Sequence, residues 1–267
     1  MNSPFKHISK LSSILFLFTF SFSHNCIHDT EVELWGQCYN IKTTVKLNLS
    51  GIGLAGEIPS EVGRLYNLYS LDLSNNQLSG SIPSDIGKLV NLKFLYLQDN
   101  RLTGIIPSEI GNLVNLNRLF LSGNKLSGSI PLEIKNLKQL EYLHLFKNKL
   151  SGIIPPGISS LIHLFKLDLS LNDFSGEIPI EIGALTKLNS LRLFDNELSG
   201  SIPLTIKNLS ELEFLFLQNN QFSGQVPSLL CNQKDLNINI GGNKFCPPYP
   251  ICLSKTDINF QDTLNCY

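Results

Sequence analysis

A pattern of 24 residues that recurs through most of the chain limits what this sequence can fold into. It is clearest in residues 68–91, LYSLDLSNNQLSGSIPSDIGKLVN, and it starts again at Leu92, Leu116, Leu140, Leu164, Leu188 and Leu212. A weaker copy begins at Thr44, and the copy that begins at Leu212 is one residue short. The spacing of apolar residues fits neither one helix nor one strand. One such unit cannot bury its own leucines, so we expect stacked units that share a core.

Each unit divides into a short strand, a bend and a return path. The alternation Leu71-Asp72-Leu73 predicts a very short strand, and residues 86–89 predict one irregular or 3₁₀-like turn. Glycine recurs at position 13 and proline at position 16; we interpret the glycines as allowing close backbone approach and the prolines as fixing φ. Asparagine recurs at position 9, where its amide would satisfy backbone donors and acceptors at the bend. We interpret these columns as scaffold. The asparagines are Asn76, Asn100, Asn124, Asn148, Asn172, Asn196, Asn220 and Asn243.

The unit LxxLxLxxNxLSGxIPxxIGxL, over residues 44–245, resembles a known family. It is similar to the plant-type leucine-rich repeat of receptor-like kinase ectodomains, receptor-like proteins and polygalacturonase-inhibiting proteins. The resemblance implies an α/β repeat solenoid, a right-handed superhelix with a parallel β-sheet on its concave face, and an extracellular recognition role. The two ends depart from the plant pattern. LWGQCYNIKTT near the start and CPPYPICLSKTDINFQDTLNC at the end are similar to segments of leucine-rich-repeat proteins secreted by marine bacteria.

The chain is expected to have four parts. Residues 1–23 are predicted to be a secretory signal peptide, because two lysines precede an apolar run and small residues follow it. A membrane anchor is the alternative, but the run is shorter than the roughly 20 residues that span a bilayer. Residues 24–43 would then form an N-terminal cap, residues 44–234 eight repeats, and residues 235–267 a terminal half repeat and a Cys-rich cap. No second long apolar segment follows, so we expect a secreted or extracellular protein without a membrane span after signal cleavage.

The cysteines flank the repeats. In a chain with a predicted secretory signal, this placement favours disulfide bonds over a metal site, and no histidine accompanies the four C-terminal cysteines. The two N-terminal cysteines are the natural pair. The other four allow three pairings, among which the sequence does not choose. The six residues are Cys26, Cys38, Cys231, Cys246, Cys252 and Cys266.

No pattern in the sequence predicts catalysis or a cofactor. Only 16% of residues are charged and the net charge is -1, so the basic surface that nucleic acids require is not expected. The five histidines form no metal-spaced pair. GIGLAG at residues 51–56 has the glycine spacing of a dinucleotide-binding loop, but EIP follows where a helix should start. Two sequons, at Asn48 and Asn208, would carry glycans in a eukaryotic host.

Ligand binding is predicted on the concave face. Side chains alternate along a strand, so positions 2, 3, 5, 7 and 8 are expected to face solvent there, in stripes across successive units. Aromatic side chains and arginines gather in these stripes, a composition typical of protein-binding surfaces. The alternative is that the rings only stiffen the sheet by cross-strand packing. The first group is Phe94, Tyr96, Phe120, Tyr142, His144 and Phe146, bordered by Arg118; the second is Arg192, Phe194, Phe214 and Phe216.

These observations favour a secreted, non-enzymatic recognition protein that binds an extracellular protein or polysaccharide ligand through its concave face. An inhibitor of secreted glycan hydrolases, which the resemblance to polygalacturonase-inhibiting proteins implies, is the second hypothesis. A structural or adhesion module is the third. The identity of the ligand and the oligomeric state stay open.

Overall fold

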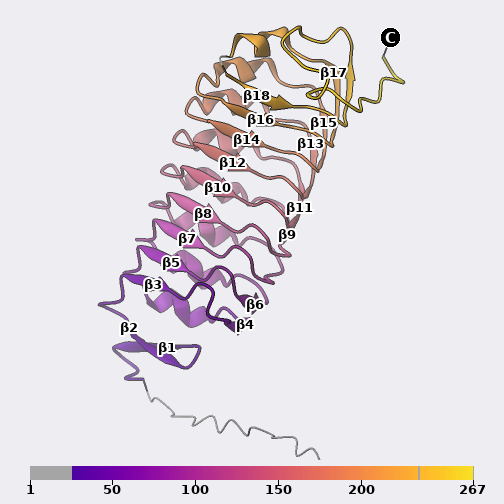
Figure 1. Ribbon diagram of the computed structural model, residues 1–267. Coiled ribbons are helices and arrows are strands. Elements are labelled where there is room, and N and C mark those ends of the chain that lie inside the picture. Colours follow the sequence, from indigo (N-terminus) through magenta and orange to yellow (C-terminus); the bar gives the residue numbers. More distant parts are fainter. Residues whose placement is uncertain (1–25, 234, 267) are drawn as a thin grey trace, which may run out of the picture.

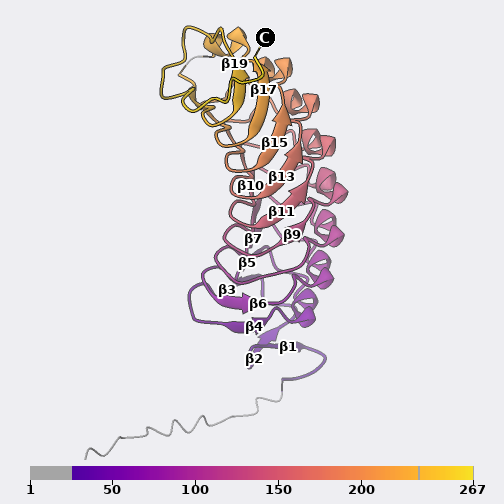
Figure 2. The ribbon, with the colours of Figure 1, turned by 90° about the vertical axis from the view of Figure 1, so that its right-hand side faces the viewer.

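A computed structural model describes residues 26–233 and 235–266. Within these residues the units stack into a solenoid, with strands on one side and short helical turns on the other (Figures 1 and 2). The predicted signal peptide lies outside the described residues. No helix among the described residues is long and apolar enough to cross a membrane.

A parallel sheet of nine strands lines the concave side of the described solenoid (Figures 1 and 2). Equal positions of successive units pair, as in Leu71 with Leu95 and Leu95 with Leu119, so the predicted parallel register is confirmed. The middle residue is a buried leucine in eight of these strands and the buried Ile238 in the last, and its neighbours lie on the outer face of the sheet. The strands are β3 (Lys46–Asn48), β5 (Ser70–Asp72), β7 (Phe94–Tyr96), β8 (Arg118–Phe120), β10 (Tyr142–His144), β12 (Lys166–Asp168), β14 (Ser190–Arg192), β16 (Phe214–Phe216) and β18 (Asn237–Asn239).

Further parallel pairing, which the sequence analysis did not predict, runs along a neighbouring side of the solenoid (Figure 2). Its strands form a six-stranded sheet and a separate pair, with a bridge from Ser81 to Thr103 beside that pair. They are β4 (Ala55–Glu57), β6 (Gln77–Ser79), β9 (Ser127–Gly128), β11 (Lys149–Gly152), β13 (Asp173–Gly176), β15 (Glu197–Gly200), β17 (Gln221–Gln225) and β19 (Lys244–Cys246). We call this set the second sheet.

The position-13 glycines lie in or beside the second sheet, and the reason predicted for them is wrong. All eight have φ between 73° and 86°, a conformation that glycine adopts without strain. A Cβ added at Gly56 would meet nothing within 4 Å, whereas one at Gly80 would come within 2.8 Å of the Glu57 side chain. Their shared requirement is therefore backbone conformation rather than close backbone approach.

A five-residue 3₁₀ helix follows the recurring proline of each unit; the turn predicted over residues 86–89 is observed over Ser84–Lys88 and so begins two residues earlier. The proline is the N-cap, with φ between -67° and -62°, and its carbonyl accepts the first hydrogen bond, as in Val62 N to Pro59 O at 3.1 Å. Proline has no backbone N–H, but no hydrogen bond is lost, because the helix offers no carbonyl acceptor to an N–H at this position. The turns are η1 (Ser60–Arg64), η2 (Ser84–Lys88), η3 (Ser108–Asn112), η4 (Leu132–Asn136), η5 (Pro156–Ser160), η6 (Ile180–Ala184), η7 (Leu204–Asn208) and η8 (Ser228–Asn232).

Between these layers lies one continuous core, with the asparagine column at its edge. Asn100 shows the repeated arrangement: its Nδ2 donates to the carbonyls of Leu73 and Leu97 at 2.9 and 3.1 Å, and its Oδ1 accepts the Leu78 N–H at 3.0 Å. Each such amide therefore joins its own bend to the preceding unit. The predicted scaffold role of these asparagines is confirmed.

Both ends of the described stack are closed by disulfide-bonded caps. At the first end a hairpin of β1 (Glu31–Leu34) and β2 (Gln37–Asn40) carries the Cys26–Cys38 disulfide, the pair that the sequence favours. Val32 and Leu34 from this hairpin are buried in the core. At the other end the structure selects one of the three possible pairings, Cys231–Cys252 and Cys246–Cys266.

The tail after β19 continues the backbone hydrogen bonds of the solenoid. Ile240 N donates to Asp257 O and Gly242 N to Asn259 O, both at 2.8 Å. Gln261 takes the role of the next asparagine: its Oε1 accepts the Phe245 N–H at 3.0 Å and its Nε2 donates to Ile240 O at 2.8 Å. The tail thus satisfies groups that the end of a solenoid would otherwise leave unpaired.

Candidate ligand-binding face

The predicted concave side chains lie outside the core, as their register requires. In β7, β8, β10 and β16 the middle leucine is buried and the two flanking side chains are half-buried. The rings of Tyr96 and Phe120, on adjacent strands, therefore lie on the surface of the sheet rather than beneath it. Their partial burial comes from contacts with one another.

The first predicted group forms one continuous chain of ring contacts. Tyr96 meets Phe120 edge to face with ring centroids 5.2 Å apart, and Phe120 stacks on His144 at 4.3 Å with the rings 8° from parallel. Tyr142 and Phe146 contact His144, each at 6.4 Å. Such pairs have preferred ring orientations, so they fix the position of the side chains as well as burying apolar surface.

Two further aromatic side chains, absent from the predicted site, extend this chain at both ends. Tyr69 lies 6.4 Å from Phe94, and Phe165 lies 5.9 Å from Tyr142, both edge to face. Both occupy position 2, a column expected to face solvent, so an aromatic search of that column would have found them. We call the whole set the concave patch: Tyr69, Phe94, Tyr96, Arg118, Phe120, Tyr142, His144, Phe146 and Phe165.

Arg118 lies inside the concave patch rather than at its border. Its guanidinium carbon is 5.5 Å from the centre of the Phe94 ring and 5.0 Å from that of Tyr142, within cation–π range of both. Its Nη1 is 3.5 Å from the Tyr96 hydroxyl. Burial lowers the pKa of His144, which lies one strand away, and Asp168 partly opposes that shift. The patch therefore carries one fixed cation and one histidine whose neutral form is favoured.

The second predicted group is smaller and lies apart from the first. Phe214 and Phe216 contact at 6.2 Å, and the Arg192 guanidinium lies 5.4 Å from the Phe216 ring centre. Phe194 is half-buried and makes no ring contact with another aromatic side chain of the described residues. Lys166, Asp168 and Ser190 occupy the adjacent strand positions between the two groups.

Not every concave position faces solvent, which corrects the prediction for the small side chains. Ser70 and Ser190 are 5% and 3% exposed, and Asp168 is 9% exposed. Asp168 Oδ1 accepts both the N–H and the hydroxyl of Ser170, at 3.1 and 2.6 Å. Larger side chains on neighbouring strands cover these short ones, so the recognition surface is narrower than five full columns.

The two sequon asparagines are both exposed. Asn48 ends strand β3 on the concave sheet, and Asn208 ends turn η7 on the opposite side. Asn48 Oδ1 accepts the Ser50 N–H at 3.0 Å within its own turn. Glycosylation of either residue stays a prediction.

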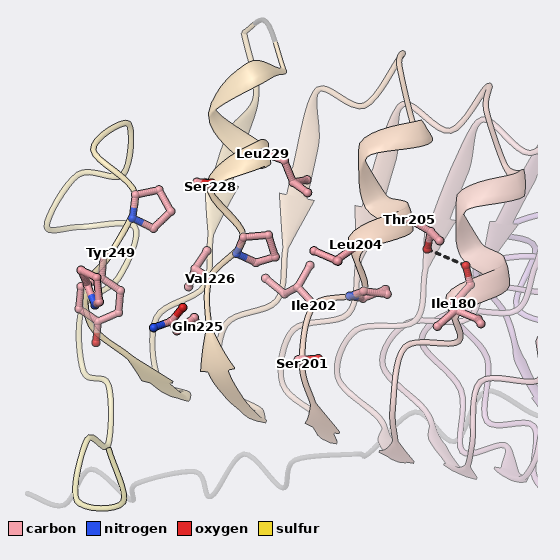
Figure 3. Close-up of a pocket in the computed structure, with 14 residues that line it drawn as sticks. Ile180, Ser201, Ile202, Leu204, Thr205, Gln225, Val226, Ser228, Leu229 and Tyr249 are labelled. Carbon is pink, nitrogen blue, oxygen red and sulfur yellow. Dashed lines mark hydrogen bonds between the residues drawn. The ribbon is translucent and has the colours of Figure 1, made fainter. Parts of the chain in front are cut away.

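A separate hollow lies between the last units and the C-terminal cap (Figure 3). It has a volume of about 830 Å³, and prolines and apolar side chains, among them Leu204, Val226 and Tyr249, form much of its wall. Thr205 donates its hydroxyl proton to Ile180 O at 2.6 Å at one end of it (Figure 3). No charged or histidine side chain belongs to its described lining, so the hollow offers no acid–base pair for chemistry.

Comparison with known proteins agrees with this architecture. A family model described as a leucine-rich repeat region matches residues 3–151, and a single-repeat model of the same family matches residues 163–185, 187–209 and 211–233. The chain belongs to the leucine-rich-repeat family. No curated protein matches this leucine-rich-repeat chain.

Plant receptors are among the similar solved structures. The plant peptide hormone receptor RGFR1, solved in complex with RGF2, is 41% identical with a TM-score of 0.71, and the match covers 72% of this chain and 31% of that one. The Arabidopsis receptor kinase HAESA, in complex with the peptide hormone IDA and the co-receptor SERK1, is 37% identical with a TM-score of 0.71, covering 75% of this chain and 34% of that one. The leucine-rich-repeat chain thus spans about a third of the length of these receptors.

A similar structure closer in length is a plant ice-binding protein. It is 27% identical with a TM-score of 0.70, and the match covers 82% of this chain and 76% of that one. Disulfide bonds at both ends of the described leucine-rich-repeat chain are typical of a protein outside the cell or at its surface.

Proposed function

We propose that this chain is a secreted, non-enzymatic recognition protein whose concave patch binds an extracellular ligand. The observation that carries the proposal is the continuous set of ring contacts from Tyr69 to Phe165 on the outer surface of the sheet. The core, the asparagine, glycine and proline columns and the disulfide-bonded caps account for the scaffold without these rings. Half-exposed aromatic side chains grouped around an arginine are the composition of binding hot spots.

Packing alone does not account for the patch. Cross-strand packing would stiffen the sheet wherever it occurred, yet the rings occupy adjacent strands of one region, and serines take the same positions elsewhere, as at Ser70 and Ser190. The similar plant receptors were solved with peptide ligands, which supports a protein segment as ligand. A polysaccharide ligand stays the alternative for the same surface.

The test uses a variant that combines Tyr96→Ala, Phe120→Ala and Tyr142→Ala. Random peptides and a glycan array would be screened against the wild-type chain, and each ligand found would be titrated against both proteins. Because the rings lie outside the core, the variant should unfold close to the wild-type denaturant midpoint while its affinity falls at least about a hundredfold.

The matched control truncates three exposed apolar side chains away from the concave patch: Ile105→Ala, Leu132→Ala and Ile153→Ala, which are 62%, 67% and 58% exposed. This control should bind as the wild type does. Equal affinity of the concave variant and the wild type for every ligand found would place recognition elsewhere.

Ice binding by the second sheet is a second candidate function. The likeness to a plant ice-binding protein of similar length favours it. So does a column of hydroxyl side chains at position 12, one on each successive coil, at the strand spacing of about 4.8 Å. The column is Ser79, Thr103, Ser127, Ser151, Ser175, Ser199 and Ser223.

Thermal hysteresis measurements would test this candidate. We expect the wild-type chain to show hysteresis and to lose it when Ser127 and Ser151, both half-buried rather than core residues, are replaced by lysine. The concave triple variant should keep it. Absence of hysteresis in the wild-type chain would contradict the candidate.

No observation favours inhibition of glycan hydrolases over these two functions, and it stays a prediction.

A further inference from the structure

Arg118 is a cation without an anion in the middle of the concave patch. The ion pairs of the described residues are His28–Asp29 and Lys88–Asp85, so no carboxylate lies within 4 Å of the Arg118 guanidinium. Its Nε is buried and donates to no acceptor. Among the residues that the structure describes, only the Tyr96 hydroxyl, 3.5 Å from Nη1, lies within hydrogen-bonding reach of its side chain.

The surroundings of Arg118 hold the guanidinium in place while leaving most of its N–H donors without an acceptor among the described residues. Phe94 and Tyr142 lie on two sides of it, with ring centres 5.5 and 5.0 Å away. Cation–π contacts use the charge of a guanidinium but not its N–H donors. A buried N–H without an acceptor is unfavourable in the free protein. The terminal Nη donors are not among the buried atoms without a partner, and a planar carboxylate of a bound molecule would accept from them in a charge-assisted pair.

We infer that Arg118 is the anchor for a carboxylate of a peptide ligand, held between Phe94, Tyr96 and Tyr142. This inference rests on the proposed function of the concave patch and adds the chemical class of the group that binds. An acidic side chain and a free chain terminus present the same chemistry. Apolar ligand side chains beside the carboxylate would lie over Phe120, two residues from Arg118 along β8.

The charge pattern of the surrounding strands favours a peptide over a polyuronate. The other cations of this region are dispersed: exposed Lys93 immediately precedes β7 and Lys147 follows Phe146, whereas Lys166 and Arg192 lie on β12 and β14, beyond β10. Glu141 immediately precedes β10, and Asp168 of β12 pairs in register with His144 of β10. A polyuronate carries a carboxylate on every sugar and would place some of them against these acids. A peptide with one carboxylate among apolar residues avoids that repulsion.

Three libraries of short N-acetylated synthetic peptides test the inference. The first has a C-terminal amide and includes Asp and Glu. The second has no acidic side chain but a free C-terminal carboxylate, and the third has neither. Oligogalacturonate is the polysaccharide probe. Binders would be titrated against the wild type, Arg118→Gln, Arg118→Lys, the matched control Arg101→Gln at an exposed arginine outside the concave patch, and the concave triple variant.

We expect binders from the first or the second library, and the library that yields them identifies the source of the carboxylate. Arg118→Gln should weaken them at least about tenfold, Arg118→Lys less because it keeps the charge but loses the fork, and Arg101→Gln not at all. Thermal unfolding of each variant shows that it is folded.

Three outcomes would overturn the inference. If the third library yields equally tight binders that Arg118→Gln leaves unchanged but the triple variant abolishes, the concave patch is the site and the carboxylate anchor is wrong. If oligogalacturonate binds in an Arg118-dependent manner and no peptide does, the peptide assignment is wrong. If no probe binds the wild type, the anchor and the proposed function fail together.

Discussion

Among single residues, the position-9 asparagine makes the most backbone contacts per side chain. Asn124 is 9% exposed; its Oδ1 accepts the Leu102 N–H at 3.0 Å and its Nδ2 donates to Leu97 O and Leu121 O at 2.9 and 3.1 Å. Alanine there would leave buried backbone groups of two units without partners. We expect Asn124→Ala to lower the free energy of unfolding by about 2–4 kcal/mol, measured by urea denaturation.

Asn112→Ala is the matched control, because Asn112 is exposed at the end of η3. It should change the free energy of unfolding by less than about 0.5 kcal/mol. Equal destabilisation by the two substitutions would mean that the asparagine column does not carry the inter-unit contacts assigned to it.

His144 should make stability depend on pH. Burial lowers its pKa below the usual 6.5; Asp168 opposes this shift, and Lys166 and Arg192 reinforce it. The unfolded chain therefore takes up the proton at a higher pH than the folded chain. The stability contributed by the neutral ring is complete above pH 6.5 and is lost as the pH falls through 6.5 toward the lower pKa of the folded state.

His144→Phe isolates this effect, because it keeps a ring for the stacking on Phe120. Denaturant midpoints of both proteins would be measured across the acidic range. The wild type should lose more stability than the variant as the pH falls. Parallel midpoint curves for the two proteins would rule out the His144 contribution.

The role of a residue that recurs at one repeat position can be predicted from the sequence when its side chain is suited to a single role. The donor and acceptor of an asparagine amide matched the open backbone groups of a bend, so its role followed from the sequence. Position 8 is a column that sequence reasoning missed: Asn75, Asp99, Lys147 and Leu171 there all have φ of 56° or 57°. Asparagine and aspartate are common in this conformation, but Lys147 and Leu171 concealed the pattern.

At the scale of elements, several contacts between stacked 3₁₀ turns depend on a glycine on one side. A Cβ added at Gly111 in η3 would lie 2.5 Å from Glu133 Cβ and 2.7 Å from Glu133 O in η4. The contact between η4 and η5 reverses this arrangement. Lys135 in η4 takes the place of the glycine, and Gly157 in η5 faces it. A Cβ added at Gly157 would lie 3.3 Å from Lys135 Cβ. Both of these contacts thus keep one side without a side chain.

Gly111→Ala should therefore destabilise the chain by about 1–3 kcal/mol through overpacking, despite the smaller entropy of the unfolded variant. Gly157→Ala should cost less, because Lys135 needs to move only a few tenths of an ångström. Thermal unfolding of the two variants and the wild type would measure both effects. A Gly111→Ala chain as stable as the wild type would show that the turns separate freely.

The two sheets differ in how far the sequence predicted them. Leu71, Leu95 and Leu119 recur with alternating polar neighbours, which fixes both the strand and its register. In the second sheet only two or three residue pairs join neighbouring strands, as at Ser151–Asp173 and Gly152–Phe174. Such short pairing follows from the stacking distance that the first sheet imposes. The second sheet has no periodic pattern of apolar residues from which it could have been predicted.

At the scale of the whole molecule, the repeat predicted the solenoid but not how its end is closed. Gln261 and the carbonyls of Asp257 and Asn259 replace the contacts of a further unit, although the tail has no repeat pattern. The predicted extent of the concave patch was also incomplete: Tyr69 and Phe165 lie in the solvent-facing position-2 column, but their ring contacts with Phe94 and Tyr142 are seen only in the folded chain. Long-range closure depends on where the tail folds back, which local spacing does not encode.

This closure predicts where unfolding begins. Each unit contacts only its neighbours, so the end units lack one stabilising interface and depend on their caps. Removal of the Cys231–Cys252 and Cys246–Cys266 bonds, which span 21 and 20 residues, by Cys→Ser at all four positions should destabilise the C-terminal end by several kcal/mol. Hydrogen exchange should then rise first at Gly242 and Phe245, next in β16, and last in the central units.

The matched variant, Cys26→Ser with Cys38→Ser, opens the other end and should reverse the order, with exchange rising first in β3 and β5. Hydrogen exchange with mass-spectrometric peptide mapping resolves the two directions in one experiment. Equal acceleration in all units of both variants would mean that the solenoid unfolds as one cooperative body. In that case the caps would stabilise the chain globally, and nearest-neighbour contacts such as those of Gln261 would not determine where it opens.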